Sequence, residues 1–241
     1  MSRSLERILR KLMKAIQDYK MIDDPAPIMV GLSGGKDSLT LLYVLNEFRR
    51  RSKHKYPLAA GHVSMGWDVD YSPLEKFCRS LNIPFYLEPT SIGPIVFDVR
   101  QEKNPCSLCA KMRRGALNNL AKKNGFSKVA LAHHIDDAVE TLLLKTFFEG
   151  RIESFAPVTY LDIKDVTVIR PFIYVPEKDI SLLAKSLDLP IVFNPCPANG
   201  ATKRQDMKEI VKLIERDNPY AKDRAISALR NLNQSKWTVK K

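Results

Sequence analysis

The residues best suited to chemistry lie in one short stretch, Gly31-Leu-Ser-Gly-Gly-Lys-Asp-Ser38. An apolar run at 28–30 precedes it, and from Leu39 onward apolar residues recur at helical spacing. A strand, a glycine turn and a helix N-terminus in this order form an anion site, because backbone N–H groups approach phosphate oxygens and the helix dipole adds positive charge. Lys36 adds a full charge, so the stretch predicts a phosphate-binding loop.

The spacing of this loop differs from that of the common P-loop, in which four residues separate glycine from Gly-Lys-Ser/Thr. Here three residues separate Gly31 from Gly35, and Asp37 follows the lysine. A carboxylate beside the lysine suits a Mg²⁺ ion that bridges nucleotide phosphates. We therefore expect Lys36 and Asp37 to act together on a nucleotide.

The cysteines form a second candidate site. Cys106 and Cys109 make a C-x-x-C just before a helix expected over 109–124, where the helix dipole favours thiolates. That pair alone fits a redox dithiol or half of a metal site. Cys196, which follows an apolar run at 191–193 expected to be a strand, supplies a third candidate ligand. Cys78 lies on the apolar face of an expected helix and is assigned to the core.

Three cysteines favour particular metal chemistry. A structural zinc site normally has four protein ligands. In a [4Fe–4S] cluster, three cysteines leave one iron without a protein thiolate and open to exogenous sulfide. The spacing of the cysteines alone fits both a zinc site and an iron–sulfur cluster, because a histidine can supply the fourth ligand of a zinc ion.

The elements that position these residues alternate between strand and helix. Strands are expected at 28–30, 58–63, 83–87, 129–132 and 166–169, and helices at 72–82, 109–124, from about 136, and at 176–188. Each strand is a continuous apolar run, which is typical of a parallel sheet covered on both faces. The fold class is therefore α/β, a doubly wound, Rossmann-like parallel sheet.

Ligands of such sheets bind beyond the carboxyl ends of the strands. The loop, His62-Val63-Ser64 and His133-His-Ile-Asp-Asp137 all follow strand ends, so three segments are expected to converge on one crevice. Asp136 and Asp137 open a helix, where one can serve as an N-cap. The alternative, which we favour for Asp136, is that a carboxylate holds Mg²⁺ or orients the acceptor base. Only one of the adjacent histidines can face the crevice, and neither is assigned as a general base.

Three parts of the chain are expected. Residues 1–24 form an amphipathic basic helix, 25–200 the nucleotide-binding domain, and 201–241 a helical C-terminal tail broken at Asn218-Pro219. The N-terminal helix fits a solvated surface helix docked on the domain. An RNA-binding face or a subunit contact in a homodimer is the alternative.

The composition indicates which classes of partner the protein binds. The 241 residues carry a net charge of +12, which indicates a polyanion, either nucleic acid or an anionic membrane surface. The apolar runs are too short to span a bilayer, and residues 1–20 lack the apolar stretch of a signal peptide. We therefore expect a cytoplasmic protein without a membrane partner.

The string Ser33-Gly34-Gly35-Lys36-Asp37-Ser38 resembles the PP-loop of the N-type ATP pyrophosphatases. Those enzymes cleave ATP between the α and β phosphates and leave AMP on an acceptor oxygen. The resemblance implies that these six residues bind ATP and that the backbone of residues 62–64 holds the adenine.

With Pro105-Cys-Ser-Leu-Cys-Ala-Lys-Met-Arg-Arg-Gly115, Ile169-Arg-Pro171 and the helix start Pro176-Glu-Lys-Asp179, the chain resembles the bacterial tRNA 2-thiocytidine synthetases from about residue 27 to 205. The resemblance implies a [4Fe–4S] cluster on Cys106, Cys109 and Cys196. ATP and Mg²⁺ would adenylate a pyrimidine carbonyl oxygen of tRNA, which sulfur then replaces. The sulfur donor would be a cysteine desulfurase or free sulfide. Basic residues at 49–55, 111–114 and 122–123, Arg113 and Arg114 above all, are candidate RNA contacts, with a solvated surface as the alternative.

Three other functions remain open from the sequence. One is a tRNA 2-thiouridine synthetase, whose relatives usually carry additional zinc-finger cysteines. Another is a lysidine-forming PP-loop ligase with structural zinc, which does not need the three cysteines. The last is a nucleotide-binding RNA chaperone or sensor, which would bind tRNA and ATP without releasing pyrophosphate.

Overall fold

A computed structural model describes residues 3–22, 25–52, 55–102, 105–193, 195–197 and 203–232. Its centre is a six-stranded sheet in the order β3-β2-β1-β4-β6-β5. The strands are β1 (Ile28–Gly31), β2 (Leu58–Val63), β3 (Phe85–Glu88), β4 (Lys128–Ala130), β5 (Val158–Leu161) and β6 (Val166–Ile169). All neighbours pair in parallel except β5 and β6, which are antiparallel at one edge.

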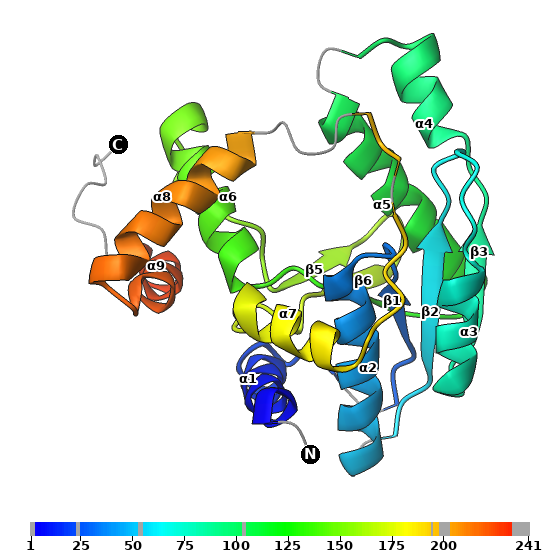
Figure 1. Cartoon of the computed structure of the whole chain (residues 1–241), viewed down its shortest axis with the longest axis horizontal. Helices are drawn as coiled ribbons and strands as arrows, with labels where there is room; N and C mark the ends of the chain where they lie inside the picture. Colours follow the sequence, from blue (N-terminus) through cyan, green and yellow to red (C-terminus); the bar gives the residue numbers. More distant parts are fainter. Residues whose placement is uncertain are drawn as a thin grey trace.

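Helices cover both faces of the sheet (Figure 1). They are α1 (Arg3–Tyr19), α2 (Lys36–Arg51), α3 (Ser72–Ser80), α4 (Ile92–Pro94), α5 (Pro105–Lys123), α6 (Ile135–Glu149), α7 (Glu177–Ser186), α8 (Lys203–Asp217) and α9 (Ala221–Arg230). A π-helical turn, Ile95–Val99, follows α4. None of the helices in these described ranges is long and apolar enough to cross a membrane.

Alternation along the buried strands divides the core into two layers. In β1, Ile28 and Val30 join a cluster with α1, α2 and α7, while Met29 joins the opposite cluster with α5. Successive side chains of a strand point to opposite faces, so a continuous apolar run serves both layers. The predicted doubly wound α/β sheet is thereby confirmed.

The terminal helices share the first of these layers. The apolar stripe of α1 is buried within the chain, against α7 among other elements, and Val211 of α8 and Ile226 of α9 belong to the same cluster. The stripe is therefore not free to join two subunits. The division of the chain at residues 24 and 200 stays a prediction.

Three local predictions were wrong. Residues 191–193 form an extended connection and no strand; Val192 donates its N–H to the Gly34 carbonyl at 3.0 Å. Helix α5 begins at Pro105, not near residue 110, because proline is favoured in a first helical turn. Strand β5 was missed, since its residues are only half buried on the edge of the sheet.

Candidate active site

The phosphate loop joins the end of β1 to the start of α2. Gly34 adopts φ +87°, a left-handed conformation that favours glycine. Ser38 holds the loop closed: its hydroxyl accepts from the Ser33 N–H at 3.0 Å and donates to the Gly35 carbonyl at 3.0 Å. Sequence and structure thus agree on a tight strand-to-helix turn.

The N-terminus of α2 is suited to an anion. Among the described residues no side chain caps it; Gly35 occupies the N-cap position. The first-turn N–H groups of a helix have no intrahelical acceptor, so they remain available for phosphate oxygens. Lys36 stands at this terminus and pairs with Asp37 at 2.8 Å and with Glu177 of α7 at 2.9 Å.

A cavity of about 850 Å³ lies beyond the carboxyl ends of β1 and β2. It brings together many of the residues expected to function, namely Ser33, His62, Val63, Cys106, Arg113 and Arg114. Strands β1 and β4 are neighbours here, while β2 and β3 extend the sheet on one side and β6 and β5 on the other. This is the topological switch point where open α/β sheets bind ligands.

One wall of the cavity has the features of a base-binding edge. Gly31 pairs with Gly61, so β2 continues for two residues, His62 and Val63, beyond the end of β1. His62 donates from Nδ1 to the Leu32 carbonyl at 2.7 Å, and its buried Nε2 has no partner among the described residues. Burial lowers the pKa of His62, so this nitrogen is an acceptor at neutral pH.

The backbone of Ser64 faces β3. Its N–H donates to the Glu88 carbonyl at 2.9 Å, and its own carbonyl accepts from the Thr90 hydroxyl at 2.5 Å. Both backbone groups of Ser64 are therefore engaged with the β3 side of the sheet. Alternate residues of a strand direct their backbone groups to the same side, so His62 also faces β3 and the free backbone edge beyond β1 is that of Val63.

Cys106 is the cysteine that lines this cavity in the described part of the chain, and Pro195, next to Cys196, lines it as well. Cys106, in the first turn of α5, is exposed, while Cys109 and Cys196 are half buried and Cys78 is buried as predicted. Burial raises the pKa of Cys109, and the nearby thiols of Cys196 and Cys106 raise it further. Among the described residues no three side chains already stand as metal ligands. The donor set of three free thiols from two segments nevertheless fits an iron–sulfur cluster.

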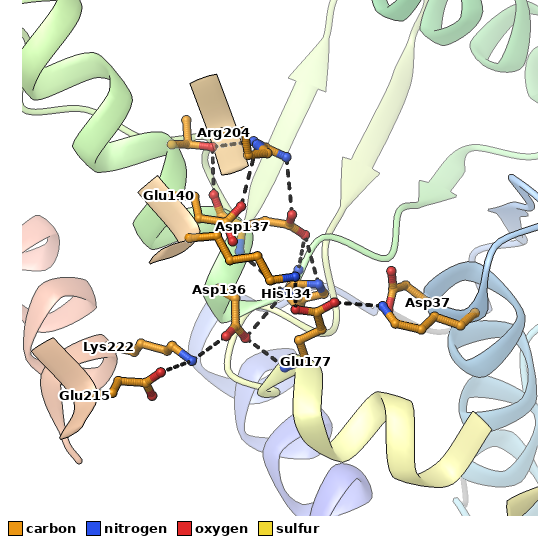
Figure 2. Close-up of polar contacts among 12 residues, drawn as sticks. Asp37, His134, Asp136, Asp137, Glu140, Glu177, Arg204, Glu215 and Lys222 are labelled. Carbon is orange, nitrogen blue, oxygen red and sulfur yellow. Dashed lines mark hydrogen bonds and ion pairs between the residues drawn. The ribbon is translucent and has the colours of Figure 1, made fainter. Parts of the chain in front are cut away.

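Asp136 is not among the residues that line this cavity, and Figure 2 shows its carboxylate directed toward Lys222 and the start of α7. Its carboxylate accepts from the Glu177 N–H at 2.7 Å and pairs with Lys222 of α9, which also pairs with Glu215 at 2.8 Å. Burial alone raises the pKa of Asp136, but hydrogen bonds from His134, Lys222 and Glu177 hold it well below its usual range. Asp136 thereby joins the starts of α6 and α7 to α9.

The other residues of the His133–Asp137 motif have two kinds of role: His134 and Asp137 stabilise the start of α6, and His133 lines the cavity. His134 is the N-cap of α6 and forms a reciprocal capping box with Asp137. His133 lines the cavity, where burial lowers its pKa to about 4, so its ring is neutral. The prediction that only one of the two histidines faces the crevice is confirmed.

The structure adds residues that the sequence did not single out. Glu177 accepts from Lys36 and from Lys208 of α8 at 2.7 Å, and although burial opposes it, these bonds lower its pKa to about 2. Arg204 of α8 lines the cavity, pairs with Asp137 at 3.3 Å and donates to Thr141 at 2.9 Å. The only sequence signal for Glu177 was its place after Pro176 at a helix start.

Several basic residues of the predicted RNA-binding clusters lie outside the cavity in ion pairs. Arg50 and Arg51 pair with Glu47, and Lys122 pairs with Asp165 at 2.5 Å. Residues 53 and 54 of the predicted 49–55 cluster lie outside the described residues. Arg113 and Arg114, in contrast, are exposed within the cavity.

The fold and site define a nucleotide-binding α/β protein with its phosphate loop at the switch point. Comparison with known proteins agrees: residues 3–211 match the PP-loop domain family. Two curated relatives named tRNA-cytidine(32) 2-sulfurtransferase, from Citrifermentans bemidjiense and Geobacter sp. strain M21, are each 37% identical over 94% of this chain and 91% of their own length.

A solved structure is also similar. The U34-tRNA thiolase NcsA from Methanococcus maripaludis, with its [4Fe–4S] cluster, superposes with a TM-score of 0.80 at 26% identity, over 96% of this chain and 80% of the other. The chain belongs to the PP-loop domain family, in the branch of its tRNA-cytidine(32) 2-sulfurtransferase relatives.

Proposed function

We propose that this protein is an ATP-dependent tRNA sulfurtransferase that converts cytidine at position 32 of tRNA to 2-thiocytidine. The observation that carries the proposal is the single cavity shared by Ser33 of the PP-loop, the carboxyl end of β2 and Cys106. Activation by ATP and delivery of sulfur can thus occur in one space. The name of the 37%-identical relatives supports cytidine 32 as the target.

The first step is adenylation of the base. The adenine of ATP lies along residues 62 and 63, and its phosphates lie at the α2 N-terminus, where N–H groups and Lys36 neutralise their charge. The cytosine O2 attacks the α-phosphorus, the bond to the β-phosphate oxygen breaks, and pyrophosphate leaves. Asp37, on the side of the phosphates, is the proposed ligand of a Mg²⁺ ion that shares this charge.

The second step replaces the activated oxygen, with AMP as the leaving group. The proposed ligands of a [4Fe–4S] cluster are Cys106, Cys109 and Cys196; held by three thiolates, the cluster would leave one iron without a protein ligand, and its chemistry there would be to carry the sulfide. Arg113 lies close enough to Cys109 to oppose the rise of that thiol's pKa, so it favours the thiolate.

The target base enters from an unpaired loop of the RNA, because a paired base cannot reach a cavity. Arg113 and Arg114 on the cavity wall contact its phosphates. Free sulfide is one sulfur source in this proposal and needs no reductant; a cysteine-desulfurase persulfide is the other, and a thiol reductant would have to supply two electrons to release its outer sulfur as sulfide. The proposed location is cytoplasmic, with a homodimer as one candidate assembly.

Mass spectrometry of tRNA nucleosides, from a strain that lacks this protein and from its parent, tests the proposal. We expect 2-thiocytidine to disappear in the deletion strain and to return on complementation. A Lys36→Ala gene should fail to restore it, because the phosphates then lose their charged partner.

A loss of 2-thiouridine in place of 2-thiocytidine would contradict the assigned base but keep the reaction, in line with the similarity to the U34-tRNA thiolase. A loss of lysidine, or no change in any thionucleoside, would contradict sulfur transfer itself.

A further inference from the structure

We propose that Phe148, at the end of α6, is a stacking platform for an unpaired base of the RNA substrate, beside the entrance of the active-site cavity. The inference rests on the proposed function, because it needs an RNA in this cavity. It goes beyond that function by assigning a surface that recognises the loop around the target nucleotide.

The position of Phe148 follows from the helix that carries it. Thr141, Leu144 and Lys145 of α6 line the cavity. Residues at i, i+3, i+4 and i+7 share one face of a helix, so Phe148 continues this wall one turn further, toward the rim. Figure 1 shows α8 starting beside this end of α6.

The ring is presented to solvent beside positive charge. Phe148 is 54% exposed, although burial of a phenylalanine ring is favourable. The Lys203 ammonium of α8 lies over one face of the ring, 4.5 Å from its centroid, so a base would stack on the opposite face. A second exposed ring, Phe193, lines the same cavity from the segment that follows α7.

Aromatic rings among basic side chains are the usual means by which proteins bind unpaired nucleotides, since every base has a face that can stack. Arg204, Arg113 and Arg114 line the same cavity and can neutralise phosphates on either side of a stacked base. The net charge of +12 favours this occupant over an apolar protein surface.

The neighbouring Phe147 provides a matched control. It has the same side chain and is 67% exposed, so its replacement removes as much apolar surface. Successive residues of a helix differ by about 100° in direction. Phe147 therefore points away from the face that forms the cavity wall.

Fluorescence anisotropy tests the assignment with three RNA probes: an unmodified tRNA transcript, its isolated anticodon stem-loop, and a duplex of the same stem without a loop. The proteins are the full chain and its Phe148→Ala, Phe148→Tyr and Phe147→Ala variants. We expect Phe148→Ala to weaken binding of the tRNA and the stem-loop about 10-fold while duplex binding stays unchanged. Phe148→Tyr and Phe147→Ala should bind as the wild type does.

Wild-type affinity of Phe148→Ala for the stem-loop would overturn the stacking role and leave the proposed function standing. An equal loss in Phe147→Ala, or an equal loss on the duplex, would also overturn it. Failure of the wild type to bind any tRNA would overturn the proposed function together with the inference.

Discussion

At the scale of single residues, similar side chains in this protein differ in function because their surroundings differ. Cys78 and Cys109 are both thiols on helices, but burial raises the pKa of Cys78 to about 12, which keeps it protonated and inert. Cys109 lies near two other thiols and an arginine that lines the cavity. Only the second environment is suited to a metal ligand.

This contrast predicts the iron content of two variants. Cys196→Ala should lose bound iron after anaerobic purification, because two thiolates do not retain the proposed cluster. Cys78→Ala should keep the wild-type amount, although the cavity it leaves in the core lowers its stability. Iron and sulfide assays, with the visible absorption band of the cluster, provide the measurement. Equal iron in the two variants contradicts the three-ligand assignment.

At the scale of elements, α7 and α8 help to position the PP-loop. The Glu177 carboxylate at the start of α7 pairs with Lys36 of α2 and with Lys208 of α8. Burial opposes ionisation of Lys36, but the hydrogen bonds to Asp37 and Glu177 raise its pKa, so the ammonium remains charged where phosphates bind. Glu177 is thus a positioning residue.

Replacement of this carboxylate should therefore impair ATP use without unfolding the protein. We expect Glu177→Gln to raise the KM for ATP by about 10-fold, since a charge-assisted hydrogen bond contributes about 1.5–3 kcal/mol. Steady-state pyrophosphate release, with tRNA as acceptor, gives the KM, and thermal melting checks the fold. Lys212→Ala, one turn beyond Lys208 on α8, is the control and should match the wild type.

An unchanged KM in Glu177→Gln would refute the positioning role. A loss of activity that parallels a fall in melting temperature would show that Glu177 is only structural.

At the scale of the whole molecule, the C-terminal helices belong to the same core as the sheet. Ile226 is 8% exposed and lies in the cluster that contains α1 and α2. The ion pairs of Lys222 with Asp136 and of Arg204 with Asp137 attach the same helices to α6. Because the C-terminal helices share a hydrophobic core and ion pairs with the rest of the domain, we expect them to unfold together with the sheet.

Unfolding experiments test this cooperativity. Ile226→Ala should lower the free energy of unfolding by about 2–4 kcal/mol and leave a single transition, because it empties part of a shared core. Leu213→Ala, at a site 56% exposed, should change it by less than about 0.5 kcal/mol. Urea denaturation followed by circular dichroism is the measurement. Two separate transitions would instead favour an independent C-terminal tail.

The sequence by itself determined the chemistry and the type of fold. Continuous apolar strands require cover on both faces, and the glycines, Lys36 and Asp37 form a strand-to-helix turn whose backbone conformation is set by neighbouring residues. The alternation of strands and helices was therefore predictable, and so was the convergence of the strand ends.

Tertiary structure alone decided which charges meet. Lys36 and Glu177 are 141 residues apart, and Lys222 and Asp136 are 86 apart, so no local pattern indicates these pairs. The edge strand β5 and the extended segment at 191–193 were mispredicted for a related reason, because long-range contacts fix their conformation. The position of Phe148 on the cavity's rim likewise follows from the packing of α6 and α8. The sequence does not indicate which charged residues and which cavity lie next to an exposed ring.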